Sequence, residues 1–130
     1  MKYEFTDDYL TGIEAIDQEH RRLFEITNGV YDLLTNEFME DKYDRIVAIM
    51  EELRDYTKTH FAHEEAYMEG IHYQRRFSQM LQHKLFIERL DGLDLKQIDA
   101  AQQQALLDIV DFLAKWLIGH IKGMDCRIGK

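Results

Sequence analysis

Apolar residues recur at spacings of three and four along most of the chain, the pattern of amphipathic helices. A first run starts at Asp17, and its apolar face comprises Leu23, Val30 and Leu34 with Phe24, Thr27 and Tyr31 beside them. A second and more regular run ends near Gly70, and its seam comprises Ile46, Ile49, Leu53, Tyr56, His60, His63 and Tyr67. Steps that alternate between three and four are typical of a helix in a bundle.

Two further runs follow. The third extends from about Tyr73 to Leu90, is closed by Asp91–Gly92, and carries Phe77, Met80, Phe86 and Leu90. The fourth begins near Asp99, and its stripe comprises Leu106, Ile109, Leu113, Trp116 and His120. Four helices with short connections favour an antiparallel, up-down-up-down four-helix bundle.

The remaining features of the chain fit one all-α domain over residues 1–130. Proline is absent and only seven glycines occur, which suits long helices. Residues 1–16 are mixed and aromatic, and Gly12 interrupts any early helix, so we expect an extended N-terminal arm before a bundle over 17–130. Either Asp17 or Thr11 could cap the first helix.

Composition and charge narrow the classes of partner. Hydrophobic residues make up 45% of the chain, enough for a proper core. The net charge of −9 disfavours nucleic acid and anionic membranes as partners. No stretch has the length of a membrane span, the N-terminus lacks the apolar run of a signal peptide, and the lone Cys126 indicates no disulfide. We therefore expect a cytoplasmic protein in which Cys126 is a small buried residue.

Histidines interrupt the apolar seams. His20, His60 and His120 occupy positions where the pattern expects apolar residues, and His83 has a comparable place on the third helix. Burying four imidazoles would cost several kcal/mol, on the order of 1–3 kcal/mol each, unless each found a partner. A single core histidine is usually hydrogen-bonded to a neighbouring group. Four of them, one on each predicted helix, indicate a shared metal site.

Two carboxylates strengthen this interpretation. Glu64 follows His60 by four residues and shares its helix face, although such a pair alone is usually solvated. Asp125 follows His120 by five residues, which is about 140° around an ideal helix, so it joins the site only if the helix end loosens near Gly123. Six ligands exceed one zinc site, and two bridged ions use them better. Iron, zinc and manganese remain open on spacing alone.

The chain resembles the bacterial branch of the hemerythrin family over nearly its whole length. The matching segments are 12–13 with 16–20 and Leu23, the His60-Phe61-Ala62-His63-Glu64-Glu65 run, His83 with Phe86, and 116–121 with Asp125. The resemblance implies two Fe ions, bridged by carboxylates and by oxo or hydroxo, that bind O2 reversibly. It assigns His20 and His60 to one iron, His83 and His120 to the other, and Glu64 and Asp125 to both.

The resemblance also implies an apolar O2 pocket next to the iron pair. Its residues would be Phe61, Phe86, Trp116, Leu117 and Ile121, all of which could equally be ordinary core residues. One departure matters: Gln79 stands where the family has a further histidine, one turn before His83. The second iron would then keep two histidines, with water or an added anion completing its shell. His63 and His72 are alternative substitutes for the missing ligand.

Three functions remain open at this point. A sensor would pass a change of O2, redox state or NO at the iron pair to an output domain, for example a fused cyclic-dinucleotide enzyme. Gln79 favours the sensor, because an open coordination position on the iron admits solvent and anions such as azide. A freestanding O2 carrier would suit 130 residues. A ferritin-like oxidase or peroxidase would need paired Glu-x-x-His motifs, and only Glu69–His72 fits. We therefore expect a binding or sensory domain, not an enzyme, and it could be part of a longer signalling protein.

Overall fold

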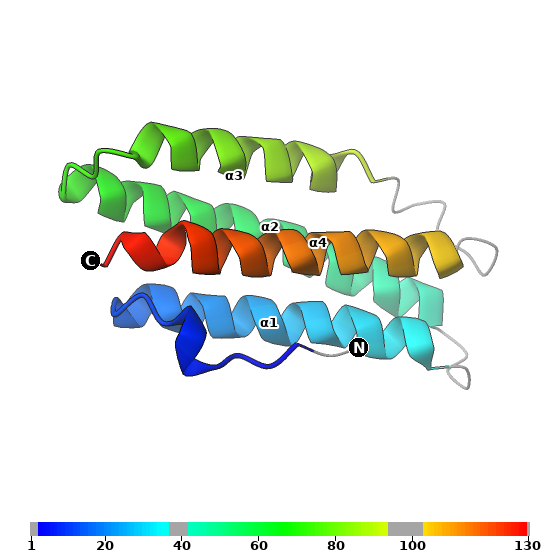
Figure 1. Ribbon diagram of the computed structural model, residues 1–130. Coiled ribbons are helices and arrows are strands. Elements are labelled where there is room, and N and C mark those ends of the chain that lie inside the picture. The colour runs from blue at the N-terminus through cyan, green and yellow to red at the C-terminus, as the bar shows by residue number, and fades with distance from the viewer. Residues whose placement is uncertain (1–2, 37–41, 94–102, 130) are drawn as a thin grey trace.

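The computed structural model describes residues 3–36, 42–93 and 103–129. Within these ranges lie four α-helices and two 3-10 turns: η1 (Asp7–Tyr9), α1 (Glu14–Thr35), α2 (Lys42–Gly70), α3 (Arg76–Asp91), α4 (Gln103–Gly123) and η4 (Asp125–Arg127). The chain reverses direction from each helix to the next, and the four helices lie alongside one another (Figure 1). The predicted all-α, up-down-up-down bundle is confirmed.

The start of α1 shows how a tight turn replaces the expected cap. The helix begins at Glu14 rather than at Asp17. Gly12 has a φ of 84°, in the left-handed region that favours glycine, and so ends the arm. The Asp17 carboxylate accepts hydrogen bonds from the backbone N–H of Thr11 and from its hydroxyl, both at 2.8 Å. Asp17, inside the helix, and Thr11, before it, therefore fix the start of α1 together by hydrogen bonds to each other.

The other helix ends agree with the sequence to within a turn where they can be compared. α2 ends at Gly70, as predicted, and α3 begins at Arg76 rather than at Tyr73. The predicted start of the last helix near Asp99, and the side chain of Leu106, lie outside the described residues. No helix in the described part of the chain is both long enough and apolar enough to cross a membrane.

The predicted seam of α2 drifts out of register toward its end. Ile46, Leu53 and His60 are buried as expected, but His63 and Tyr67 are exposed, and Glu64 and Met68 are buried in their place. A strict alternation of three and four follows a period of 3.5, whereas the helix has 3.6 residues per turn. The error accumulates over the length of α2 and rotates its last predicted positions toward solvent.

The predicted apolar face of α3 is wrong in its first half. Phe77 and Met80 are exposed, at 68% and 41%, whereas the polar Gln79 and His83 are fully buried. Phe86 and Leu90 are buried as predicted. The helix thus turns its polar side chains inward over one stretch, which marks the location of a site.

The core has an apolar half and a polar half. Apolar side chains fill one half, which is formed by the end of α1, the start of α2 and the first part of α4 whose side chains the structure describes. These apolar side chains include Val30, Leu34, Ile46, Met50, Leu53, Val110 and Leu113. The buried histidines lie toward the other half, since the helices run antiparallel (Figure 1). The apolar half can therefore stabilise the fold while the polar half holds side chains that packing alone would disfavour.

The N-terminal arm is fastened along the bundle. Asn28 of α1 binds the backbone of Tyr3 twice, accepting from its N–H and donating to its carbonyl, each at 2.8 Å. The Tyr3 hydroxyl donates a hydrogen bond to Asp111 of α4 at 2.8 Å. Burial, as the larger cause, and this hydrogen bond together raise the pKa of Tyr3 to about 12. Phe5 packs edge-on against Phe24 at 5.2 Å. The arm thus ties α1 to α4. Cys126 is buried, as expected.

Replacing Asn28 by alanine should release this arm. The substitution removes both hydrogen bonds to Tyr3 at a half-buried position, so we expect a loss of about 1–2 kcal/mol in the free energy of unfolding. Urea denaturation followed by circular dichroism measures it. Gln18→Ala, at an exposed position of the same helix, is the control and should change stability little. Equal stability of the Asn28 variant and the parent would contradict the arm's role.

Candidate metal centre

Each of the four helices contributes one imidazole to a single buried cluster. The exposed fractions are 0% for His20, 1% for His60, 2% for His83 and 5% for His120. The condition for Asp125 to join the site, a loosening of the helix end near Gly123, is met: α4 ends at Gly123, and Asp125 opens the 3-10 turn η4. This turn brings the Asp125 carboxylate, 1% exposed, back to the imidazoles.

One group of ligand atoms gathers between α1, α2 and η4. His20, His60, Glu64 and Asp125 each place one potential ligand atom within 4.8 Å of all the others. His60 Nε2 lies 2.7 Å from Glu64 Oε1, and His20 Nε2 lies 3.2 Å from Asp125 Oδ2 and 3.9 Å from Glu64 Oε1. All four residues are buried, so water cannot easily replace these contacts.

A second group of three ligand atoms adjoins the first. It consists of His83, His120 and Asp125. His83 Nε2 and His120 Nε2 are 3.1 Å apart, and His120 Nε2 is 3.2 Å from Asp125 Oδ1. Asp125 belongs to both groups, and one oxygen faces each. Glu64 belongs to the first, and its Oε1 lies 3.9 Å from His83 Nε2. The six predicted ligands are therefore brought together around two adjacent positions.

Three of the imidazoles are oriented by a residue on the preceding helix. Glu19 of α1 contacts His60 Nδ1 at 2.9 Å, Glu65 of α2 contacts His83 Nδ1 at 3.3 Å, and Gln82 of α3 contacts His120 Nδ1 at 2.9 Å. A carboxylate or an amide oxygen accepts, so each Nδ1 carries the proton. When the imidazole is neutral, each Nε2 then presents its lone pair to the cluster, as a metal-binding histidine requires.

Sequence reasoning missed these three orienting residues. Each adjoins a predicted ligand along the chain, in the pairs Glu19–His20, Glu64–Glu65 and Gln82–His83, yet it serves an imidazole of the next helix. A polar residue beside a seam position normally faces solvent. Only the packing of neighbouring helices assigns its partner, and the single available signal was this repeated adjacency.

Burial and the neighbouring charges set the ionisation of the cluster. Burial lowers the pKa of His60, but its contacts with Glu19 and Glu64 outweigh this and raise the pKa to about 9. For His83 burial dominates and lowers the pKa to about 4. Burial raises the pKa of Asp125, yet its contacts with His120 and His20 hold that pKa far below the usual range. The cluster therefore combines an ionised carboxylate with a neutral imidazole.

The cluster contains several buried polar atoms that lack hydrogen-bond partners. Among the described residues they are His20 Nδ1 and Nε2, His60 Nε2, Glu64 Oε1 and Oε2, Gln79 Oε1 and Asp125 Oδ2. His60 Nε2 and Glu64 Oε1 are close, but their geometry is not that of a hydrogen bond. Unpaired buried groups of this kind are rare in folded proteins and call for an ion or another explanation.

The spacing of the donor atoms fits bound metal ions. Ligand atoms at about 2.0–2.2 Å from one ion lie roughly 3 Å from one another. The separations of 3.1 Å and 3.2 Å around His120 have this size. Imidazole nitrogen and carboxylate oxygen without thiolate suit iron, zinc or manganese. The residues present therefore fit a pair of such ions.

Aromatic rings cover the imidazoles of the second group. Phe61 stacks on His83 with centroids 3.8 Å apart, and Trp116 stacks on His120 at 4.7 Å. Phe86 stacks in turn on Trp116 at 4.1 Å. The other predicted pocket residues, Leu117 and Ile121, belong to the buried core. The aromatic part of the predicted pocket thus faces the second group.

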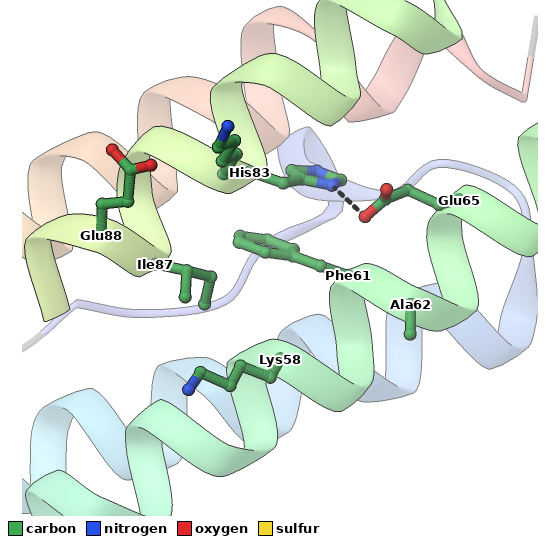
Figure 2. Close-up of a pocket in the computed structure, with 8 residues that line it drawn as sticks. Lys58, Phe61, Ala62, Glu65, His83, Ile87 and Glu88 are labelled. Atoms are coloured by element: carbon green, nitrogen blue, oxygen red, sulfur yellow. Dashed lines mark hydrogen bonds and ion pairs between the residues drawn. The ribbon is translucent and has the colours of Figure 1, made fainter. Parts of the chain in front are cut away.

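A groove between α2 and α3 leads from the surface to His83. Its volume is about 470 Å³, and the residues that line it include Phe61, Ala62 and Ile87. Figure 2 shows His83 above the Phe61 ring. Glu65 is hydrogen-bonded to His83 at one side of the groove, and Lys58 lies at the far end. His83, one residue of the second group, therefore borders a solvent-open groove, although only 2% of it is exposed.

The two alternative histidines lie outside the cluster. The side chain of His63 is 57% exposed, and its Nδ1 contacts Glu19 Oε2 at 2.6 Å. His72 is exposed between α2 and α3. Gln79 itself is fully buried and donates from Nε2 to Asp125 Oδ1 at 3.0 Å. Neither histidine replaces a ligand at its position.

Comparison with known proteins identifies the family. Residues 11–128 match the model of the hemerythrin HHE cation binding domain. The chain belongs to the hemerythrin family. It is 41% identical to a bacteriohemerythrin of Clostridium acetobutylicum over 123 residues, which are 95% of each chain. It is 34% identical to a bacteriohemerythrin of Pseudomonas aeruginosa over 119 residues, which are 92% of this chain and 74% of that one.

A more distant relative extends the similarity beyond bacteria. A hemerythrin-like protein of Naegleria gruberi is 23% identical over 125 residues, 96% of this chain and 89% of its own. Hemerythrin domains bind a di-iron centre and take O2 as a ligand, and bacteriohemerythrins bind oxygen rather than act as enzymes. The buried histidines and carboxylates of this hemerythrin-family chain could hold such a centre.

His72 offers a test that separates backbone strain from metal binding. Its φ of 54° is in the left-handed region, which costs a residue with a side chain more than it costs glycine. His72→Gly should therefore raise the free energy of unfolding by about 0.5–1 kcal/mol and leave the iron content unchanged. His72→Ala, which keeps the strain, is the control. Loss of iron in both variants would show that His72 is a ligand after all.

Proposed function

We propose that this chain is a sensor in which the di-iron centre detects O2 or redox state and reports it to an output domain. The iron pair supplies reversible O2 binding and a change of oxidation state. One observation carries the sensor function: the second group offers three protein ligand atoms where the first offers four, and Gln79 lies beside it in place of an imidazole. We expect the protein to act in the cytoplasm.

Within this proposal, each ligand has a stated role. His20 and His60 hold one metal position and His83 and His120 hold the other. Glu64 and Asp125 join the two, since the oxygens of Asp125 face both groups and Glu64 lies within reach of His20, His60 and His83. Phe61, Phe86 and Trp116 exclude water from one side of the second position. Leu117 and Ile121 would complete the apolar wall.

A second position beside a solvent-open groove favours a sensor over a carrier. A carrier has to protect its oxygenated centre from water and anions, whereas a sensor only needs to change state and recover. Here His83 borders a solvent-open groove and is covered by the single ring of Phe61. Small ligands such as NO or azide could enter by the same groove. We therefore expect rapid oxidation of the oxygenated protein.

The second candidate function is an O2 carrier. It is favoured by the Clostridium acetobutylicum relative, which this chain matches over 95% of that protein's length. A chain of about this size therefore occurs in that relative without a large additional domain. A sensor of the same size would have to report to a separate protein instead of a fused output domain such as a cyclic-dinucleotide enzyme.

The lifetime of the oxygenated centre decides between the two functions. The iron-loaded protein is reduced without air, mixed with O2, and followed by its visible absorption as the oxygenated form appears and decays. A sensor with an open second position should decay within minutes, and azide should accelerate the decay. An oxygenated absorption that persists for hours would contradict the sensor and support the carrier.

A further inference from the structure

We propose that the two metal positions are chemically unequal, because the amide oxygen of Gln79 serves the second one as a weak, neutral ligand. The second position then binds a divalent metal more weakly than the first and exchanges it first. This inference rests on the proposed metal centre but not on its role as a sensor. It assigns a ligand that neither the family match nor the cluster of histidines and carboxylates includes.

The position of Gln79 places its amide at the edge of the second group. It lies one helical turn before His83 on α3 and is 0% exposed. Its Nε2 donates to Asp125 Oδ1 at 3.0 Å, and the same oxygen lies 3.2 Å from His120 Nε2. Oε1 and Nε2 are bonded to the same carbon, so Oε1 belongs to an amide that already contacts the second group.

The amide oxygen is otherwise unexplained. Gln79 Oε1 is buried and has no hydrogen-bond partner. All other unpaired buried side-chain atoms in the described residues belong to His20, His60, Glu64 or Asp125, which are proposed ligands. A buried carbonyl without a partner costs free energy. A metal ion bound between Asp125 and His120 would remove that cost for Gln79 as it does for the others.

The ligand chemistry predicts the order of affinities. The first position has two imidazoles and both carboxylates close by. The second has two imidazoles, one oxygen of Asp125, this amide, and the more distant Glu64 Oε1, which lies 3.9 Å from His83 Nε2. A neutral amide oxygen suits hard cations and binds a transition metal less strongly than imidazole does. The Nε2 hydrogen bond also draws electron density from Asp125 Oδ1. Both effects weaken the second position and not the first.

Titration of the metal-free protein with Co2+ tests the inequality directly. Calorimetry and the visible absorption of Co2+, which depends on coordination, are recorded together for four proteins: the parent, Gln79→His, Gln79→Leu, and the control Gln104→His on the exposed face of α4. The parent should show two steps that differ in affinity by about tenfold or more, the scale of effects from single groups at a metal site, beyond the statistical ratio for two equal positions.

The variants should move the second step alone. Gln79→His should bring it close to the first, Gln79→Leu should weaken it further, and Gln104→His should match the parent. Two equal steps in the parent, or an unchanged second step in Gln79→Leu, would overturn the role of Gln79 and leave the metal centre standing. No Co2+ binding at either position would overturn the centre itself. Circular dichroism of each metal-free variant shows that it is folded before titration.

Discussion

Removing the metal should destabilise this protein by about 5 kcal/mol when each ion is present at a hundred times its dissociation constant, since each bound ion then contributes about 2.7 kcal/mol. The structural reason is the set of buried, unpaired atoms around His20, His60, Glu64 and Asp125. Without an ion, these groups have lost water and gained no equivalent partner. The measurement is the thermal midpoint before and after anaerobic treatment with a chelator.

Two comparisons make this result specific. Returning the metal should restore the midpoint, because the helices and their apolar half do not depend on the ions. The same chelator should leave the midpoint of the metal-free protein unchanged, which excludes an effect of the chelator on the chain. A loaded protein and a stripped protein that melt at the same temperature would show that the cluster is a polar core without a metal function.

The bundle and the site were predictable from the sequence for different reasons. The helices follow from periodic apolar residues, and errors of register at Tyr67 and Phe77 left the number and order of helices unaffected. The imidazoles were found because they violate that periodicity: His60 stands in a seam that Leu53 otherwise defines. A buried polar residue in an apolar stripe needs a partner, so the anomaly itself indicated a site.

What the sequence could not show is how neighbouring helices meet. Glu19 orients His60 across a helix interface, and its sequence position beside His20 does not reveal this. Asp125 lies on the wrong side of an ideal helix, and its participation depended on the break after Gly123, which the structure contains. The sequence also did not show whether the Gln79 side chain is buried, because a polar residue at a ligand position could equally have turned toward solvent.

Asp125→Asn should have the largest effect of any single substitution on metal binding. Asp125 is the one residue, among those described, that belongs to both groups, with Oδ2 3.2 Å from His20 and Oδ1 3.2 Å from His120. Asparagine keeps the shape but removes the charge and places an N–H where one oxygen was. We expect affinity at both positions to fall by more than the roughly 10–100-fold typical of a residue that only supports a ligand.

A comparison with Glu64→Gln separates a residue that serves both metal positions from one that serves mainly the first. Glu64 belongs to the first group and lies 3.9 Å from His83, so its loss should weaken the first position more than the second. Asp125→Asn should instead abolish both. The number of iron ions per chain after reconstitution measures the difference, and Asp108→Asn, at an exposed position of α4, is the matched control. If the Asp125 variant retained two irons while the Glu64 variant lost both, Glu64 and not Asp125 would be the residue that joins the two positions.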